Sequence, residues 1–118
     1  MDAPKIQTAI PQRRYRLGEY QAVVLGDIES GDARRYQYIL ALVRAGETKP
    51  RCFITAERAP RERRAEGSHV LRLVTEAFVE ELGASDAWGD IDAFSAEALT
   101  LAARTRVIEA RPILIGPR

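Results

Sequence analysis

The sequence holds one thiol and one imidazole, Cys52 and His69. A thiol beside an imidazole base is the nucleophilic pair of many covalent enzymes, so these residues are the first candidates for catalysis. Their surroundings do not favour this chemistry. Cys52 lies in a strand-like apolar segment, where cysteine usually behaves as a small buried hydrophobic residue, and we place His69 at the start of a helix. One cysteine and one histidine also cannot supply a usual zinc site.

The acidic residues 86–92 have the composition of a calcium-binding loop. An EF-hand loop aligned from Asp86 would place Trp88 at the third position, where an oxygen ligand is needed. We therefore expect Asp86 and Asp90 to form turns and Asp92 to cap a helix. The sequence also lacks a phosphate-binding glycine loop and a nucleophile elbow. It thus predicts no catalytic residue, no metal site and no cofactor.

Arginines are mixed with tyrosines in two segments, Arg13–Arg16 and Arg34–Tyr38. Cations and aromatic rings on one exposed sheet face can bind single-stranded nucleic acid. Strand alternation argues against such a platform, because Tyr36 and Tyr38 share a face with Leu40 while the arginines face outward. We expect the arginines, together with a charged connector, to contact a partner. The candidate partner-binding residues are Arg14, Arg16, Arg35, Arg61, Arg63 and Arg64.

The first half of the chain reads as strands that position these arginines. Alternating or β-branched segments span residues 13–17, 20–29, 34–44 and 51–57. They are separated by short segments with turn chemistry at 18–19, 30–32 and 46–50. Short loops favour antiparallel neighbours, so we predict a four-stranded antiparallel meander.

The second half reads as two helices. After a charged connector at residues 58–67, apolar residues recur at helical spacing from Leu71 to Leu82, with Ser68 as the N-cap and Gly83 as the stop. A second helix runs from residue 93 or 95 to 107. Its inward residues are Phe94, Ala98, Leu101 and Ala102. Residues 113–115 of the tail can add an edge strand.

These elements predict one α+β domain over residues 1–118, with two helices packed on the sheet. Its parts are an N-terminal arm (1–12), the sheet (13–57), the connector (58–67), the helices (68–107) and a tail (108–118). The third strand is apolar at every position from Ile39 to Val43, which indicates that both faces of the sheet are covered. A second copy of the chain is our favoured cover, giving a homodimer. One helix on each face, together with the tail, is the alternative.

Composition and charge narrow the class of protein. The 118 residues are 46% hydrophobic and 30% charged, which suits one globular domain. The net charge of +1 excludes a strongly basic nucleic-acid binder recognised by charge alone. Residues 1–64 carry 13 basic against 8 acidic side chains (net +5), and the rest carries 5 against 9 (net −4). The first residues do not resemble a signal peptide, and no apolar run is long enough for a membrane span, so we expect a cytoplasmic protein without membrane contact.

Together these features favour a small, non-catalytic interaction or regulatory protein that acts through protein–protein contacts as a homodimer. In that view, the arginines, the connector and the tail residues 113–115 form the contact surface. The alternative is a nucleic-acid-binding domain that uses the basic half. A third hypothesis is a small-molecule-binding domain or enzyme with a pocket between sheet and helices near Trp88.

Overall fold

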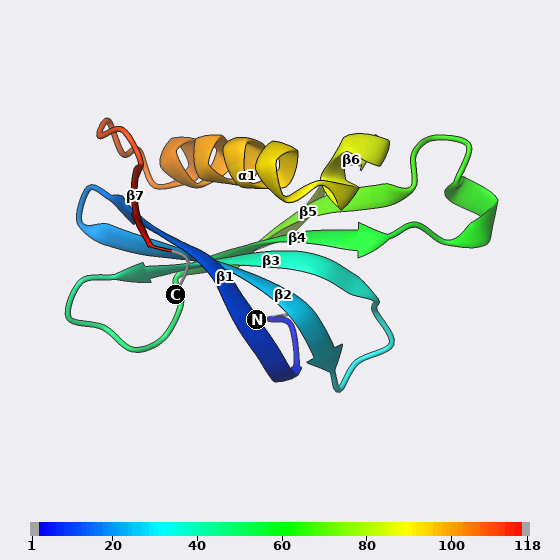
Figure 1. Ribbon diagram of the computed structural model, residues 1–118, viewed down its shortest axis with the longest axis horizontal. Helices are drawn as coiled ribbons and strands as arrows, with labels where there is room; N and C mark the ends of the chain where they lie inside the picture. The colour runs from blue at the N-terminus through cyan, green and yellow to red at the C-terminus, as the bar shows by residue number, and fades with distance from the viewer. Residues whose placement is uncertain (1–2, 117–118) are drawn as a thin grey trace.

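A computed structural model describes residues 3–116, which form one antiparallel sheet with a single α-helix lying across one face (Figure 1). The strands are β1 (Ile6–Leu17), β2 (Tyr20–Ser30), β3 (Tyr36–Arg44), β4 (Cys52–Arg58), β5 (His69–Thr75), β6 (Val79–Ser85) and β7 (Ile113–Gly116). The helix is α1 (Ile91–Thr105), and the 3₁₀ turns are η1 (Arg61–Arg63) and η2 (Asp86–Gly89).

The strand order is β6-β5-β4-β3-β2-β1-β7. The first six strands therefore form a continuous meander, and β7 returns to the outer side of β1. The four strands predicted in the first half are confirmed, although β1 already begins at Ile6, inside the predicted N-terminal arm. The predicted edge strand of the tail is confirmed as β7.

The predicted architecture of four strands and two helices is wrong, because residues 69–85 form the hairpin β5–β6. Strand β5 is buried on both faces, and Val70 and Val74 point away from Leu71 and Leu73. A strand with two apolar faces has no clear alternation, so its spacing imitates a helix. His69 begins a strand, and Gly83 lies inside β6.

Thr75 closes this hairpin. Its Oγ1 accepts hydrogen bonds from the backbone N–H groups of Ala77 (3.2 Å) and Phe78 (3.1 Å). Threonine side chains that bind backbone donors in this way favour turns over helices. The chain therefore reverses at the position where the predicted helix would have continued.

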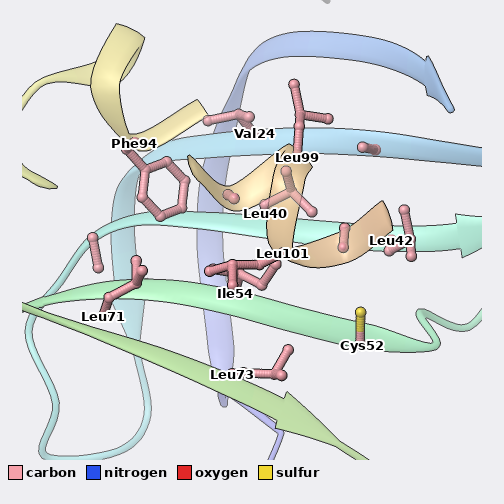
Figure 2. Packing of buried hydrophobic residues seen from close by; sticks show 14 of the residues in the cluster. Val24, Leu40, Leu42, Cys52, Ile54, Leu71, Leu73, Phe94, Leu99 and Leu101 are labelled. Atoms are coloured by element: carbon pink, nitrogen blue, oxygen red, sulfur yellow. The ribbon is translucent and has the colours of Figure 1, made fainter. Parts of the chain in front are cut away.

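The main core lies between α1 and the sheet (Figure 2). The helix contributes Phe94, Ala98, Leu101 and Ala102, as predicted, and all four are buried. They pack on residues of the central strands, and Cys52 is fully buried among them. The sheet residues labelled in Figure 2 are Val24, Leu40, Leu42, Cys52, Ile54, Leu71 and Leu73.

The opposite face of the sheet has a smaller apolar cluster. Its buried members are Ile39, Ala41, Phe53 and Val74, and parts of the chain near the N-terminus pack against them. The apolar run on β3 is thus covered on both sides within one chain. Tyr36 belongs to this cluster, so its predicted place beside Leu40 is wrong. The cause is an irregularity in the β3–β4 register between Tyr36 and Tyr38, and only Tyr38 packs on the helix side.

Within residues 3–116, no helix is long and apolar enough to cross a membrane.

Candidate anion-binding groove

A groove of about 470 Å³ opens where the start of β3 and the end of β4 meet the β4–β5 connection. We call it the arginine groove, because seven arginines line it together with Glu57 and Glu81. Figure 1 shows the β4–β5 connection extending beyond the end of the sheet. The arginines are Arg34, Arg35, Arg58, Arg61, Arg63, Arg64 and Arg72.

Backbone contacts bring these distant segments together. The N–H of Arg58 donates to the carbonyl of Arg35 (2.9 Å), which joins the end of β4 to the segment before β3. The β4–β5 connection returns at Gly67, where φ is +153° and an added Cβ would lie 2.4 Å from the backbone nitrogen of Ser85. Only glycine fits so close an approach with this dihedral angle. The connection is therefore held against the end of β6.

A buried carboxylate forms the floor of the groove. Glu57 is only 6% exposed, and its Oε1 accepts a hydrogen bond from Nη1 of Arg34 (2.8 Å). Its Oε2 accepts one from the hydroxyl of Thr55 (2.9 Å) and lies 3.1 Å from Nε of Arg72. Glu57 also raises the pKa of Arg34. A buried charge needs such partners, so Glu57 and two arginines fix one another's positions.

Arg63 is also occupied. Its guanidinium donates two parallel hydrogen bonds to the carboxylate of Glu81, both 2.8 Å long, and it lies 3.3 Å from Glu66. These carboxylates raise the pKa of Arg63. The pairing ties η1 to β6, so the charged connector is anchored at its centre.

The other four arginines of the groove have no acidic partner within 4.0 Å among residues 3–116. All four are exposed. The groove therefore presents uncompensated positive charge above a floor whose own charges are paired. These open arginines are Arg35, Arg58, Arg61 and Arg64.

A second cavity of about 580 Å³ adjoins the arginine groove and shares Arg34, Glu57 and Arg72 with it. We call it the tyrosine pocket, because Tyr36 lines it and donates a hydrogen bond to Asp32 (3.0 Å). Burial, followed by the Asp32 carboxylate, raises the pKa of Tyr36. Burial opposes ionisation of Asp32, but hydrogen bonds led by the Lys5 and Arg34 backbone N–H groups lower its pKa overall.

The structure brings together four of the six predicted partner-binding residues. Arg35, Arg61, Arg63 and Arg64 line the arginine groove. Arg14 and Arg16 lie on β1, where they pair with Gly116 and Ile113 of β7, and Arg16 lines a separate cavity of about 290 Å³. Arg58 was expected only as part of the connector, whereas Arg34, Arg72 and Glu57 were not among the predicted site residues.

The parity of β5 is the signal that would have found Arg72. Once residues 69–75 are recognised as a strand, a charged residue between Leu71 and Leu73 must lie on an otherwise apolar sheet face. A charge in that position needs an acidic partner. Glu57 on the neighbouring strand is that partner.

The strand register separates Cys52 from His69. Cys52 pairs with Thr75 at one end of the β4–β5 ladder, and Arg58 pairs with His69 at the other. Six residues along a strand correspond to about 20 Å, so a thiol–imidazole pair cannot form. Burial raises the pKa of the Cys52 thiol, which further disfavours the reactive thiolate.

The acidic segment serves the helix, but the predicted cap is wrong. Asp90, not Asp92, caps α1 by accepting a hydrogen bond from the N–H of Ala93 (2.9 Å). Asp92 lies two residues further along, in the first turn of α1, and pairs with Arg13. In the described part of the chain, no group of three or more His, Cys, Asp and Glu side chains is placed to hold a metal ion.

Trp88 packs against the main core, and it lines none of the three cavities above. The space between sheet and helix that the sequence suggested as a pocket is filled by the core side chains (Figure 2).

Comparison with family models, curated proteins and solved structures found no match to this chain.

Proposed function

We propose that this chain is a non-catalytic binding protein whose arginine groove recognises an acidic segment of a partner protein. One observation carries the proposal: four open arginines from two distant segments share one groove. Arginine-lined surfaces commonly bind acidic or phosphorylated motifs, because the guanidinium fork matches carboxylate and phosphate oxygens. No residue set in the groove supports a catalytic role in addition.

The same positive charge also suits nucleic acid, which is the second function considered from the sequence. Single-stranded nucleic acid binds best where bases stack on aromatic rings beside the cations. The residues that line the arginine groove include no aromatic side chain. The nearest ring, Tyr36, lies in the adjoining pocket with its hydroxyl bonded to Asp32. An acidic protein segment is therefore the better match.

Fluorescence anisotropy tests the proposal with a short labelled peptide rich in glutamate, at low and moderate salt. We expect binding that weakens as salt rises. The combined substitution Arg58→Ala, Arg61→Ala and Arg64→Ala should reduce affinity about tenfold or more, since three charge contacts of roughly 0.5 kcal/mol each sum to that change.

The matched control removes three positive charges elsewhere, with Lys49→Ala, Arg104→Ala and Arg111→Ala. These residues are exposed, form no salt bridge among the described residues and lie outside the arginine groove. We expect the control to bind almost as well as the unmodified chain. Equal losses in both triple variants would contradict a defined site. A mixed-sequence single-stranded oligonucleotide that binds more tightly, through the same three arginines, would favour the nucleic-acid function.

A further inference from the structure

We infer that the arginine groove takes a phosphoryl group carried by an extended peptide segment, and that the neighbouring side chain of this segment enters the tyrosine pocket. The inference rests on the proposed function and names the chemical class of its ligand. Three features support it: the number of open guanidinium groups, the fixed floor of the groove, and the cavity next to it.

The first feature is how the chain itself matches carboxylates with arginines. Arg63 engages both oxygens of the Glu81 carboxylate through two parallel hydrogen bonds, and Arg72 lies 3.8 Å from the same carboxylate. Within this chain, one or two guanidinium groups thus serve one carboxylate, as Arg34 and Arg72 do for Glu57. The four open arginines exceed what a single acidic side chain needs. A phosphoryl group carries nearly two negative charges at neutral pH and three acceptor oxygens, so it can engage several guanidinium groups at once.

The second feature is the floor of the groove, which leads from the open arginines to the tyrosine pocket. Glu57 holds both Arg34 and Arg72, and these three residues belong to the groove and to the pocket. They form the floor that the groove and the pocket share, and the charges of this floor are already paired. A ligand anchored at the open arginines can therefore continue across the floor without meeting an unpaired charge.

The third feature is the tyrosine pocket, which lies beyond the shared floor. Its lining combines apolar atoms of Val74 and Val79 with the hydroxyl groups of Tyr36 and Thr55, and it also includes Lys5 and Asp32. The Asp32 carboxylate accepts hydrogen bonds from the backbone N–H groups of Lys5 and Arg34. Both hydroxyl groups already donate, to Asp32 and to Glu57. Such a pocket suits a small uncharged side chain, such as alanine or valine. Adjoining open cavities suit an extended chain that is anchored at the exposed arginines.

The test compares three labelled peptides that differ at one position, which is phosphoserine, glutamate or serine, with valine and alanine on either side. We expect the phosphoserine peptide to bind at least about tenfold more tightly than the glutamate peptide, and the serine peptide to bind weakest. The variant Arg58→Lys, Arg61→Lys and Arg64→Lys separates the two proposals, because lysine keeps the charge but loses the planar fork. In this variant the preference for phosphoserine should fall to about threefold or less, while the glutamate peptide still binds.

Val79→Trp tests the pocket. Val79 is 37% exposed at the edge of the sheet, so tryptophan can be accommodated there without disturbing the main core. We expect this variant to weaken the phosphoserine peptide severalfold and to leave binding of free phosphoserine unchanged. Circular dichroism checks that each variant is folded.

The other results are equally decisive. Equal affinity for phosphoserine and glutamate peptides overturns the inference and leaves the proposed function standing. No binding of either peptide overturns both. A phosphoserine preference that survives the lysine variant, or an oligonucleotide that binds more tightly than the phosphopeptide, also overturns the inference.

Discussion

Glu57 is the residue on which the geometry of the groove depends. It is buried, and three neighbours bind it: Arg34, Thr55 and Arg72. Removing its charge leaves the two arginines facing each other without their common partner. The same residue therefore contributes to stability and to the shape of the candidate site.

We predict that Glu57→Gln lowers the free energy of unfolding by about 1–3 kcal/mol. This change lies below the roughly 3–5 kcal/mol of a fully buried ion pair, because Arg34 is partly exposed and regains water. Urea unfolding measures the change. Glu80→Gln is the control, since Glu80 is exposed and forms no salt bridge in the described part of the chain. It should change stability by less than about 0.5 kcal/mol, and equal effects of both substitutions would show that the Glu57 network is not stabilising.

His69 gives stability a pH dependence. Burial, followed by the positive charge of Arg58, lowers its pKa from the ordinary 6.5. The folded state keeps the ring neutral, whereas the unfolded chain takes up a proton near the ordinary pKa. The unfolded state thus binds more protons, and stability falls as the pH drops below about 6.5 towards the folded-state pKa.

We therefore expect urea unfolding to show a loss of stability as the pH falls below about 6.5, and His69→Gln to flatten this part of the profile. Because the chain has a single histidine, one NMR titration reports its pKa directly. A value above 6.5 would reverse the sign of the effect and contradict the prediction.

At the scale of elements, the start of α1 depends on one side chain. Asp90 accepts the hydrogen bond from Ala93, while Asp92 is 76% exposed and only pairs with Arg13. We predict that Asp90→Ala costs about 1 kcal/mol of unfolding free energy. Asp92→Ala should cost less, because exposed ion pairs contribute little. Thermal unfolding measures both, and Asp90→Ser should restore most of the loss. A larger loss of stability for Asp92→Ala than for Asp90→Ala would contradict the assignment of Asp90 as the cap.

The elements also show which parts of the fold the sequence can predict. Strands β2 and β3 are bounded by turn residues, and α1 has a regular apolar face, so these two strands and this helix were predicted correctly. The β5–β6 hairpin was predicted as a helix, because β5 is apolar on both faces and Phe78 and Leu82 happen to continue a helical spacing. Only the sheet that surrounds β5 explains its pattern.

The candidate site was predictable to the same extent. Four of the predicted residues lie in polar segments, so they could be selected without knowing which residues form the core. These are Arg35, Arg61, Arg63 and Arg64. Arg72 and Glu57 were missed, since each acquires its role only from pairing between neighbouring strands. The groove itself depends on the return of the chain at Gly67, which local spacing does not encode.

At the scale of the whole molecule, the homodimer stays a prediction. The apolar run on β3, which suggested it, is covered on both sides within one chain. The surfaces left for a second copy are the two edges of the sheet, where most of the exposed large apolar residues lie. These are Phe78, Val79 and Leu82 near β6, and Ile113, Leu114 and Ile115 on β7.

Exposed apolar edge strands tend to pair with another chain. We therefore expect light scattering to give a mass near twice 13.2 kDa, and Leu114→Lys or Leu82→Lys to lower it by placing a charge on one edge. A mass of one chain at every concentration would contradict the prediction. A dimer that neither substitution weakens would place the contact elsewhere.

The buried position of Cys52 allows the labelling rate of its thiol to report unfolding. The only sulfhydryl of the sequence has no exposed surface and lies on a central strand beneath α1. A thiol-reactive dye can reach Cys52 only when the structure around β4 opens, so the labelling rate measures how often this opening occurs. If the sheet opens only as a unit, labelling rates across a urea series will yield the same free energy as equilibrium unfolding. Faster labelling would reveal a partial opening of the layer between α1 and the sheet.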